Sequence, residues 1–193
     1  MSTNWLVAST NRLVKLAGVV RDKEATKAKL LEAALDEFAE YGIAGARVDR
    51  IAAKAGCNKA MIYAYFGSKE GLFDQLLKIQ IDHVVQSVPI TPDDLPGYAG
   101  RLFDAYQEEP RLLRLAAYHR LENGFDTIPE PEAQAHRHKV EAIAQAQVEG
   151  KITAVFNATD LLDLVVHMSI LAFSTPNASR DLVVRSVERL IAE

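Results

Sequence analysis

The chain has 193 residues, 49% of them hydrophobic, which is enough for one large core or for a small domain joined to a larger one. A single cysteine, Cys57, excludes an internal disulfide and a metal site with several cysteine ligands. No apolar run reaches the length of about 18 residues that favours a membrane-spanning helix. These features predict a soluble, cytoplasmic protein with no membrane partner.

The formal net charge of −4 is unevenly distributed along the chain. Residues 1–70 carry 11 Lys and Arg against 8 Asp and Glu, a balance of +3, whereas residues 71–193 carry 11 against 18, a balance of −7. A basic part attached to an acidic body suits a protein that presents only one end to DNA. The asymmetry is modest, so it supports other signals without standing alone.

Residues 1–25 form an extension in front of the first clear helical pattern. The extension contains the only tryptophan, Trp5, and lacks the basic start and the cleavage pattern of a secretory signal. Its basic residues could lie along a DNA groove as an arm. We favour a partly ordered tail or an additional helix that folds onto its own domain, because chain termini are often poorly ordered unless they are docked.

Residues 27–41 have the pattern of an amphipathic helix. Apolar side chains recur every three or four residues and form one stripe, made of Leu30, Leu31, Ala34, Leu35 and Phe38. Gly42 follows, and glycine commonly ends a helix at such a position. We expect this helix to pack on the two that come next.

Residues 48–66 fit two short helices joined by a tight turn. Apolar residues recur at helical spacing over residues 48–55, and Gly56 tolerates the left-handed backbone angles of a turn. Ala52 is small enough to let a second helix, residues 60–66, cross the first, and Ile62 points back toward it. This is helix-turn-helix geometry.

The second helix of this motif has a polar side that suits DNA. The side chains opposite Ile62 are Asn58, Lys59, Tyr63 and Tyr65. Such residues contact phosphates and base edges in a major groove. The alternative is an ordinary corner of an all-helical domain.

A long, largely apolar helix is expected directly after the motif, over residues 71–88. Ser68 can cap its N-terminus, with Glu70 close by. Lys69 lies in the first turn, where a phosphate could bind. A three-helix unit is therefore joined directly to a long helix.

Beyond residue 88 the pattern remains helical, with no alternating strand pattern of useful length, so the fold class is all-α. Prolines, glycines and asparagines mark the breaks. Five further helices are predicted at residues 94–107, 111–122, 132–149, 158–173 and 179–191.

The last two predicted helices are candidates for a subunit interface. Residues 158–173 are apolar around most of the helix circumference, so this helix needs cover on more than one side. The final helix has an apolar stripe made of Leu182, Val183, Val187, Leu190 and Ile191. Together the two could pair with the same helices of a second copy across a two-fold axis. The alternative is a purely internal core.

The residues between 27 and about 73 form a detailed pattern. It comprises Ala33, Ala34 and Phe38, Gly42, Ile51 and Ala52, Ala55 and Gly56, Asn58 and Lys59, Ile62 and Tyr63, Tyr65 and Phe66, Ser68, Lys69 and Glu70, and Leu72. This pattern resembles the N-terminal signature of the TetR family of bacterial transcriptional repressors.

The resemblance implies a homodimer that binds an operator in double-stranded DNA. It also implies that Tyr63, Tyr65 and Lys69 contact the sugar-phosphate backbone. The residues that it places near base edges are Arg47, Lys59 and Ala60.

The chain departs from the family pattern in front of the second helix. Family members usually have Thr or Ser there, which caps the helix and contacts phosphate, whereas this chain has Ala46 and Arg47. Arg47 can replace the phosphate contact through its charge, but it has no side-chain oxygen with which to cap the helix. Asp49 can contribute only its charge near the helix N-terminus.

The resemblance further implies a small-molecule effector that binds in the C-terminal part. Aromatic and histidine side chains could line its pocket, although each alone is more often part of a core. The candidates are Phe103, Tyr106, Tyr118, Phe125 and His167. No metal site is expected, because His136 and His138 are two residues apart on a helix and point to different sides.

We therefore predict a ligand-responsive repressor with an extension at residues 1–25, a helix-turn-helix DNA-binding domain at residues 26–70 and a ligand-binding and dimerisation domain at residues 71–193. The sequence contains no phosphate-binding glycine loop, nucleophile elbow or zinc-binding helix, so neither enzymatic activity nor a cofactor is expected. The rivals are a helical interaction module without DNA activity and a ligand-binding or enzyme-like bundle.

Overall fold

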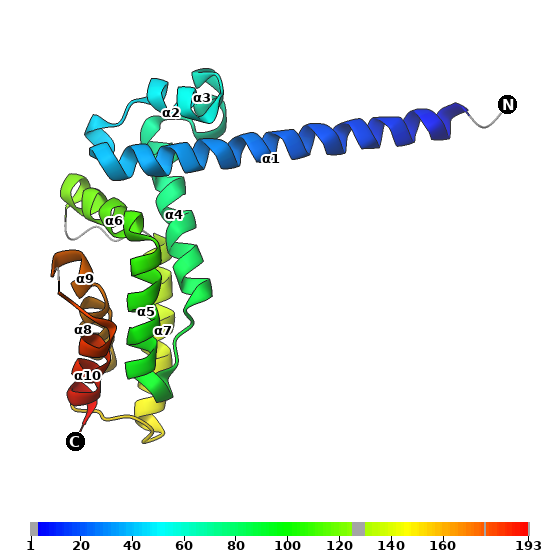
Figure 1. The fold of residues 1–193 in the computed structure, drawn as a ribbon. Coiled ribbons are helices and arrows are strands. Elements are labelled where there is room, and N and C mark those ends of the chain that lie inside the picture. Colours follow the sequence, from blue (N-terminus) through cyan, green and yellow to red (C-terminus); the bar gives the residue numbers. More distant parts are fainter. Residues whose placement is uncertain (1–3, 125–129, 176, 193) are drawn as a thin grey trace. The chain divides into compact units, whose positions relative to one another are not determined.

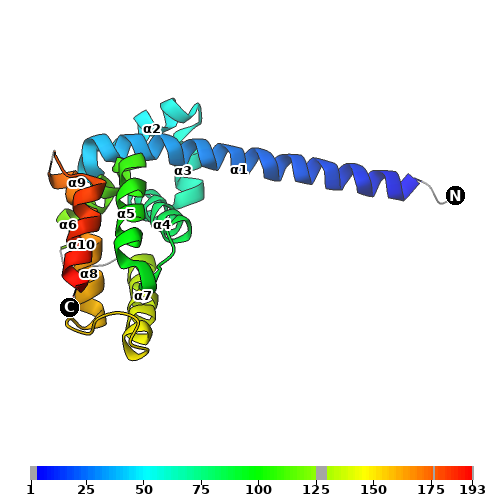
Figure 2. The same ribbon diagram turned by 60° about the horizontal axis from the view of Figure 1, so that its bottom comes forward.

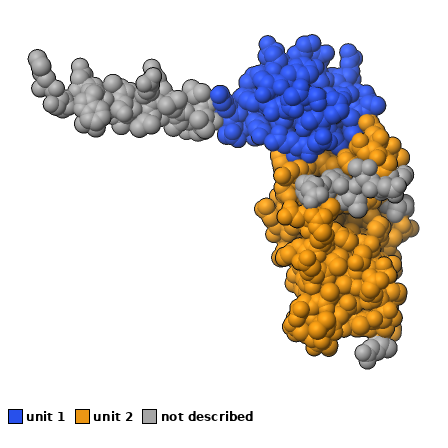
Figure 3. Space-filling view, turned by 180° about the vertical axis from the view of Figure 1, so that it is seen from behind, with its two compact units in different colours: residues 1–76 blue, residues 77–193 orange. Residues whose placement is uncertain are grey.

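The computed structural model describes residues 4–124, 130–175 and 177–192 (Figure 1). Every regular element in these ranges is helical, which confirms the predicted all-α fold. The chain divides into two compact units, Met1–Leu76 and Leu77–Glu193, coloured blue and orange in Figure 3. None of the helices in the described ranges combines the length and the apolar character that crossing a membrane requires.

Helix α1 spans Asn4–Gly45 and includes most of the N-terminal extension. Gly42 interrupts it, with φ 67° and ψ −178°, at the residue where the sequence predicts the helix to stop. Glycine adopts such a positive φ without the steric penalty that a Cβ brings. The helix predicted at residues 27–41 begins earlier than expected, at Asn4. It includes most of residues 1–25, for which the sequence suggested either a partly ordered tail or an additional helix.

The corner between α2 (Val48–Ala55) and α3 (Lys59–Phe66) has the predicted helix-turn-helix form. Gly56 ends α2 in the left-handed region, with φ 66° and ψ 32°. The N–H of Cys57 donates to the carbonyl of Ala52 at 2.9 Å, which satisfies a carbonyl at the helix end. Apart from its chain neighbours, no atom of the described residues lies within 4 Å of where a Cβ on Gly56 would be, so the backbone angle alone favours glycine.

The core of the first unit joins α1, α2, α3 and the start of α4 (Lys69–Ser87). Phe38 of α1 and Phe73 of α4 meet edge to face, with ring centroids 5.2 Å apart. Ser68 caps α4 as predicted, because its Oγ accepts a hydrogen bond from the N–H of Gly71 at 3.0 Å. Other buried residues of this core are Leu30, Leu35, Ile51, Ala52, Ile62 and Leu72.

The second unit continues α4 with a short 3₁₀ turn and further helices. In chain order these are η1 Pro92–Asp94, α5 Leu95–Glu108, α6 Pro110–Asn123, α7 Glu130–Val148, α8 Ala158–Ser169, α9 Leu171–Ser174 and α10 Arg180–Ile191. Helix α5 packs against α6, α8 and α10, and α7 packs against α8 (Figure 2). The predicted helix ends agree with these bounds to within two residues, except in one region.

The exception corrects the prediction of one helix over residues 158–173. The chain ends α8 at Ser169 and resumes as α9 at Leu171, and Ile170 between them has φ −92° and ψ 6°. The Oγ of Ser169, which is buried, donates to the carbonyl of Val165 at 2.8 Å. A serine that bonds back to the preceding turn bends a helix, which accounts for the break.

The apolar stripe of α10 is divided between the inside and the outside of the second unit. Val183 and Val187 are fully buried within the chain, whereas Leu182 is 46% exposed. The prediction that Val183 and Val187 belong to a subunit interface is therefore wrong, because α10 packs against α5 and α8 of its own chain. Sequence periodicity identifies such a stripe but does not say which helix covers it.

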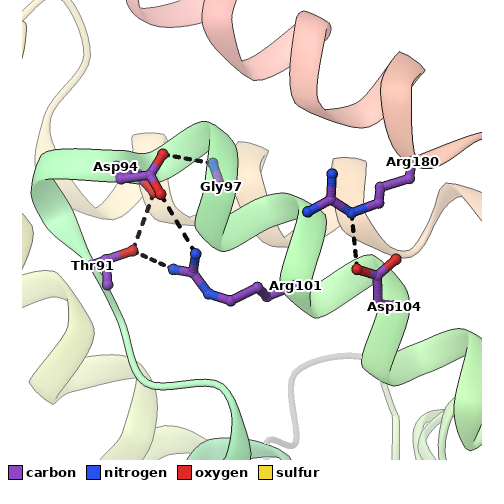
Figure 4. Close-up of polar contacts among 6 residues, drawn as sticks. All are labelled: Thr91, Asp94, Gly97, Arg101, Asp104 and Arg180. Carbon is purple, nitrogen blue, oxygen red and sulfur yellow. Dashed lines mark hydrogen bonds and ion pairs between the residues drawn. The ribbon is translucent and has the colours of Figure 1, made fainter.

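Polar contacts fix α5 at its start and along its side (Figure 4). Asp94 caps the helix, because its Oδ1 accepts the N–H of Gly97 at 2.9 Å. Farther along, Arg180 of α10 donates to Asp104 at 2.8 Å. A Cβ on Gly100 would lie 2.9 Å from Nη2 of Arg180 and 3.0 Å from Cγ2 of Val184, so a larger residue there would require these α10 side chains to shift.

Replacing Gly56 with valine should lower the free energy of unfolding of the first unit by roughly 1–3 kcal/mol, because a β-branched residue is strained at a positive φ. Chemical denaturation followed by circular dichroism measures this change. Asparagine tolerates the left-handed region better, so Gly56→Asn should lose much less stability. Equal stability of both variants and the wild type would show that the turn does not depend on the positive φ.

Candidate nucleic-acid interface

Helix α3 buries one side and presents the other to solvent. Ile62 is fully buried and anchors the helix. Lys59, Ala60 and Tyr63 are exposed, and their spacing places them on one face. Tyr65 is half-buried, with its ring edge-on to that of its neighbour in sequence. Lys59, Ala60 and Tyr63 therefore form an exposed face beside the buried Ile62, whereas Tyr65, three residues after Ile62, lies partly on the buried side.

Asn58 has a structural role that the sequence analysis did not identify. It is the N-cap of α3, and its Oδ1 accepts the N–H of Ala60 at 2.9 Å. The carbonyl oxygen of the side chain is thus engaged, and the amide group remains as the donor that can reach a phosphate. Asn58 can therefore hold the helix start and contact DNA with different atoms.

Lys59 forms an exposed ion pair that can exchange for another partner. Its Nζ lies 3.1 Å from Oδ1 of Asp49, in the first turn of α2. The two side chains are 60% and 66% exposed. Ion pairs at such exposed positions contribute little free energy, so Lys59 can turn to a phosphate or a base edge at small cost.

Arg47 is the N-cap residue of α2, and as predicted its side chain makes no capping hydrogen bond to any described residue. Its N–H instead donates to Oε1 of Glu37, in α1, at 2.8 Å. The same oxygen accepts from Nε of Arg50 at 2.8 Å, and Nη2 of Arg50 lies 2.6 Å away. A carboxylate from another helix therefore holds the start of α2, and the Arg47 side chain remains exposed.

Glu37 is 8% exposed, yet it stays ionised. Burial alone would raise its pKa, but the hydrogen bonds from Arg50 and from the N–H of Arg47 outweigh burial, and the pKa of Glu37 is lowered. Local spacing could not reveal this contact, because Glu37 lies ten residues before Arg47. One signal in the sequence could have revealed it. Glu37 lies seven residues, or two helical turns, after the buried Leu30, so this acid is on the buried side of the helix and needs a partner.

Lys69, predicted as a phosphate contact, is the first residue of α4. Its Nζ donates to the carbonyl of Ile43 at 2.7 Å and to that of Ala46 at 3.4 Å. The side chain is half-buried. The structure thus gives this ammonium group intramolecular partners, and its contact with phosphate stays a prediction.

The predicted effector-binding residues lie in different environments. Phe103 is buried on α5, and Tyr106 and Tyr118 are half-buried. Burial raises the pKa of Tyr106 to about 12. His167 is exposed on α8, and Phe125 lies outside the described residues. Of the candidates that the structure describes, only Phe103 belongs to the buried core.

Polar groups that the sequence analysis did not single out lie in the second unit. Tyr98 is fully buried, and its hydroxyl makes no hydrogen bond to the described residues. Nζ of Lys139 lies 5.7 Å from the centroid of the Tyr98 ring, and burial lowers the pKa of Lys139. A buried hydroxyl of this kind is a candidate contact for a polar atom of a ligand.

A second pair in this unit joins α7 and α8. Nε2 of His136 lies 2.8 Å from Oδ1 of Asp163. The two residues are 27 positions apart, so no local spacing indicates the contact. Within the described ranges, no group of three or more His, Cys, Asp and Glu side chains is arranged to hold a metal ion.

Two family models match this chain. The model described as bacterial regulatory proteins of the tetR family matches residues 30–76, and the model described as the tetracyclin repressor-like C-terminal domain matches residues 94–190. The chain is 47% identical over 165 residues to the HTH-type transcriptional repressor SCO4008 of Streptomyces coelicolor. The match covers 84% of this chain and 86% of that repressor.

Solved structures agree with the sequence matches. A transcriptional regulator of S. coelicolor, SCO4942, superposes with a TM-score of 0.78 at 31% identity, over 86% of this chain and 98% of the other. A TetR-family regulator from Marinobacter aquaeolei, at 21% identity, has a TM-score of 0.70 over 90% of this chain and 98% of its own. At 21% identity, the similarity to the Marinobacter regulator shows a shared fold only.

Glu37→Gln should lower the free energy of unfolding of the first unit by about 1–3 kcal/mol at neutral pH, because the amide keeps the shape of the side chain without the charge that Arg50 binds. The pKa of Glu37 is lowered in the folded protein, so its contribution is complete above the ordinary pKa of 4.5 and is lost as the pH falls through the lowered value. Chemical denaturation at several pH values should therefore show the difference from the wild type shrinking below pH 4.5.

Asp36→Asn provides the matched control for Glu37→Gln. Asp36 pairs with Lys54 at 2.6 Å on the surface, where the lysine is 57% exposed. Exposed pairs of this kind contribute about 1 kcal/mol or less, so this variant should change stability little. A Glu37→Gln deficit that is constant across the pH range would contradict the assigned role of the carboxylate.

Proposed function

The chain belongs to the TetR family of bacterial transcriptional regulators, and from that premise we propose that it is a homodimeric, cytoplasmic repressor that leaves its operator when a small molecule binds the second unit. The observation that carries this proposal is the exposed polar face of α3 over the buried Ile62. A helix held in this way can enter the major groove of DNA.

The proposed DNA contacts fall into two groups. Arg47, Lys59 and Ala60 are exposed at the starts of α2 and α3, and we assign them to base edges. Phosphate contacts come from polar groups beside that face, and these contacts position the helix without reading sequence. The residues assigned to phosphates are Asn58, Tyr63, Tyr65 and Lys69.

Exposed apolar side chains support the proposed homodimer. Leu164 on α8, Phe173 on α9 and Leu182 on α10 are 36%, 48% and 46% exposed in the isolated chain. Exposed apolar groups on successive helices of one unit suit pairing with a second copy. In such a dimer, the two copies of α3 can each bind one half-site of an operator whose half-sites are about 34 Å, or one turn of DNA, apart.

The interior of the second unit supports the proposed effector site. Phe103 and Tyr98 are buried on α5, and the Tyr98 hydroxyl, without a hydrogen bond to the described residues, offers a polar contact within apolar surroundings. Pockets for small molecules combine these features. Tyr106, Tyr118 and His167 remain candidates for contacts nearer the surface.

Binding to a duplex taken from DNA upstream of the coding region should weaken steeply as salt rises, because phosphate contacts release counterions. Lys69→Ala should remove a phosphate contact and reduce the slope of log affinity against log salt by about one unit. Fluorescence anisotropy at several salt concentrations measures both effects. A wild type without affinity for DNA would favour the rival, a helical interaction module.

Leu182→Glu should separate the subunits and weaken operator binding together, because it places a charge in the proposed interface without disturbing the core. Sedimentation velocity and operator titration measure the two effects. Leu121→Glu is the control, since Leu121 is 69% exposed on α6 and should leave the dimer intact.

Val187→Glu serves as a contrast to Leu182→Glu. Val187 is fully buried within one chain, so a carboxylate there should unfold the second unit. A Leu182→Glu variant that sediments as the wild-type dimer would refute the interface. A wild type that is monomeric at micromolar concentration would remove the dimeric mechanism.

A further inference from the structure

Asp49 and Lys59 form an exposed ion pair that joins the start of α2 to the start of α3. Asp49 lies in the first turn of α2, Lys59 is the first residue of α3, and Oδ1 of the acid is 3.1 Å from Nζ of the lysine. Asp49 does not cap α2, because Arg47 is the N-cap residue and its N–H donates to Glu37. The ion pair therefore places a carboxylate with no capping role beside a lysine that we assign to a base edge.

The pair keeps hydrogen-bonding groups of both kinds for a further partner. An ammonium group has three N–H donors, and a carboxylate has two acceptor oxygens. The contact between Nζ and Oδ1 engages at most one N–H and one oxygen, and neither side chain has another hydrogen-bond partner among the described residues. At 66% and 60% exposure, Asp49 and Lys59 can both present their remaining groups to a ligand.

An acidic side chain in a DNA interface has few favourable partners. Phosphates repel it, and in the major groove only the amino groups of cytosine and adenine donate to an acceptor. A lysine instead donates to O6 and N7 of guanine. The O6 of guanine and the N4 of its paired cytosine are about 2.9 Å apart, because the base pair itself joins them by a hydrogen bond. This separation is close to the 3.1 Å between Nζ of Lys59 and Oδ1 of Asp49.

A base pair of adenine and thymine suits the ion pair less well. The N6 donor of adenine lies beside the acceptor N7, which repels a carboxylate, and thymine offers one acceptor, O4, next to its methyl group. Guanine presents two acceptors to Lys59, and cytosine presents a donor to Asp49 without an acceptor in the major groove. The chemistry of the pair therefore favours G·C.

We propose that Asp49 and Lys59 together recognise one G·C base pair in each operator half-site. Lys59 donates to guanine, and the free oxygen of Asp49 accepts from N4 of cytosine. Asp49 is then a specificity-determining residue that α2 adds to those of α3. The inference rests on the proposed binding of α3 in the major groove.

Single base-pair substitutions in the upstream duplex test this role on the full chain. Each G·C pair is replaced in turn by T·A, so that adenine takes the place of cytosine. Fluorescence anisotropy then measures the affinities of the wild type, Asp49→Ala and Asp49→Asn for every duplex. Asp36→Asn is the matched control, because Asp36 also forms an ion pair with a lysine of α2, Lys54, but belongs to α1. Circular dichroism reports whether each variant is folded.

The wild type should lose at least about tenfold in affinity when the recognised pair of a half-site is replaced. Asp49→Ala should reduce this loss at least about threefold at that position alone, because cytosine no longer has an acceptor to bind. Asp49→Asn should bind the T·A duplex better than the G·C duplex, because asparagine pairs with N6 and N7 of adenine. Asp36→Asn should keep the base preferences of the wild type.

Three results would overturn the proposal. The first is a wild type for which no G·C replacement weakens binding, and the second is a set of Asp49 variants with wild-type preferences at every position. The third is tighter binding of both Asp49 variants to the upstream duplex and to a scrambled duplex by one common factor, since Asp49 would then act only by repelling phosphates. Failure of the proposed function is distinct, because the wild type itself would then bind the upstream duplex no better than the scrambled one.

Discussion

The hydrogen bonds that Glu37, Arg50 and Lys69 make with residues 43–47, the last turn of α1 and the link into α2, are the constraint on which the helix-turn-helix depends. Helices α2 and α3 have eight residues each, and helices of this length are not stable alone in water. Their stability comes from packing on α1 and α4 and from the groups that satisfy their ends. Glu37 satisfies the N–H of Arg47 at the start of α2, and Arg50 and Lys69 satisfy carbonyls at the end of α1 and in the link that follows it.

The sequence predicted the helices because their limits depend on nearby residues. Gly42 and Gly56 take the positive φ values expected of them, and Ser68 caps α4. The break at Ile170 escaped prediction because it depends on where the Ser169 hydroxyl points, toward the carbonyl of Val165. Apolar periodicity is the same for a straight helix and for one bent in this way.

The exposed face of α3 was predictable in part, because Ile62 was expected to point into the core, but the contacts that hold α2 and α3 in place were not. Glu37 and Arg47 are 10 residues apart, and Lys69 and Ile43 are 26 apart. Contacts of this separation depend on how helices pack, which one sequence does not reveal. The same limit explains Val183 and Val187, whose apolar character fits a subunit interface as well as the internal core where they lie.

Capping by Glu37 separates two demands that the family's usual Thr or Ser satisfies with one side chain. Because a carboxylate of α1 holds the start of α2, the Arg47 side chain makes no capping hydrogen bond to the described residues and stays exposed. Substitutions at position 47 should therefore change the stability of the first unit little. The start of α2 depends instead on Glu37, a residue of another helix.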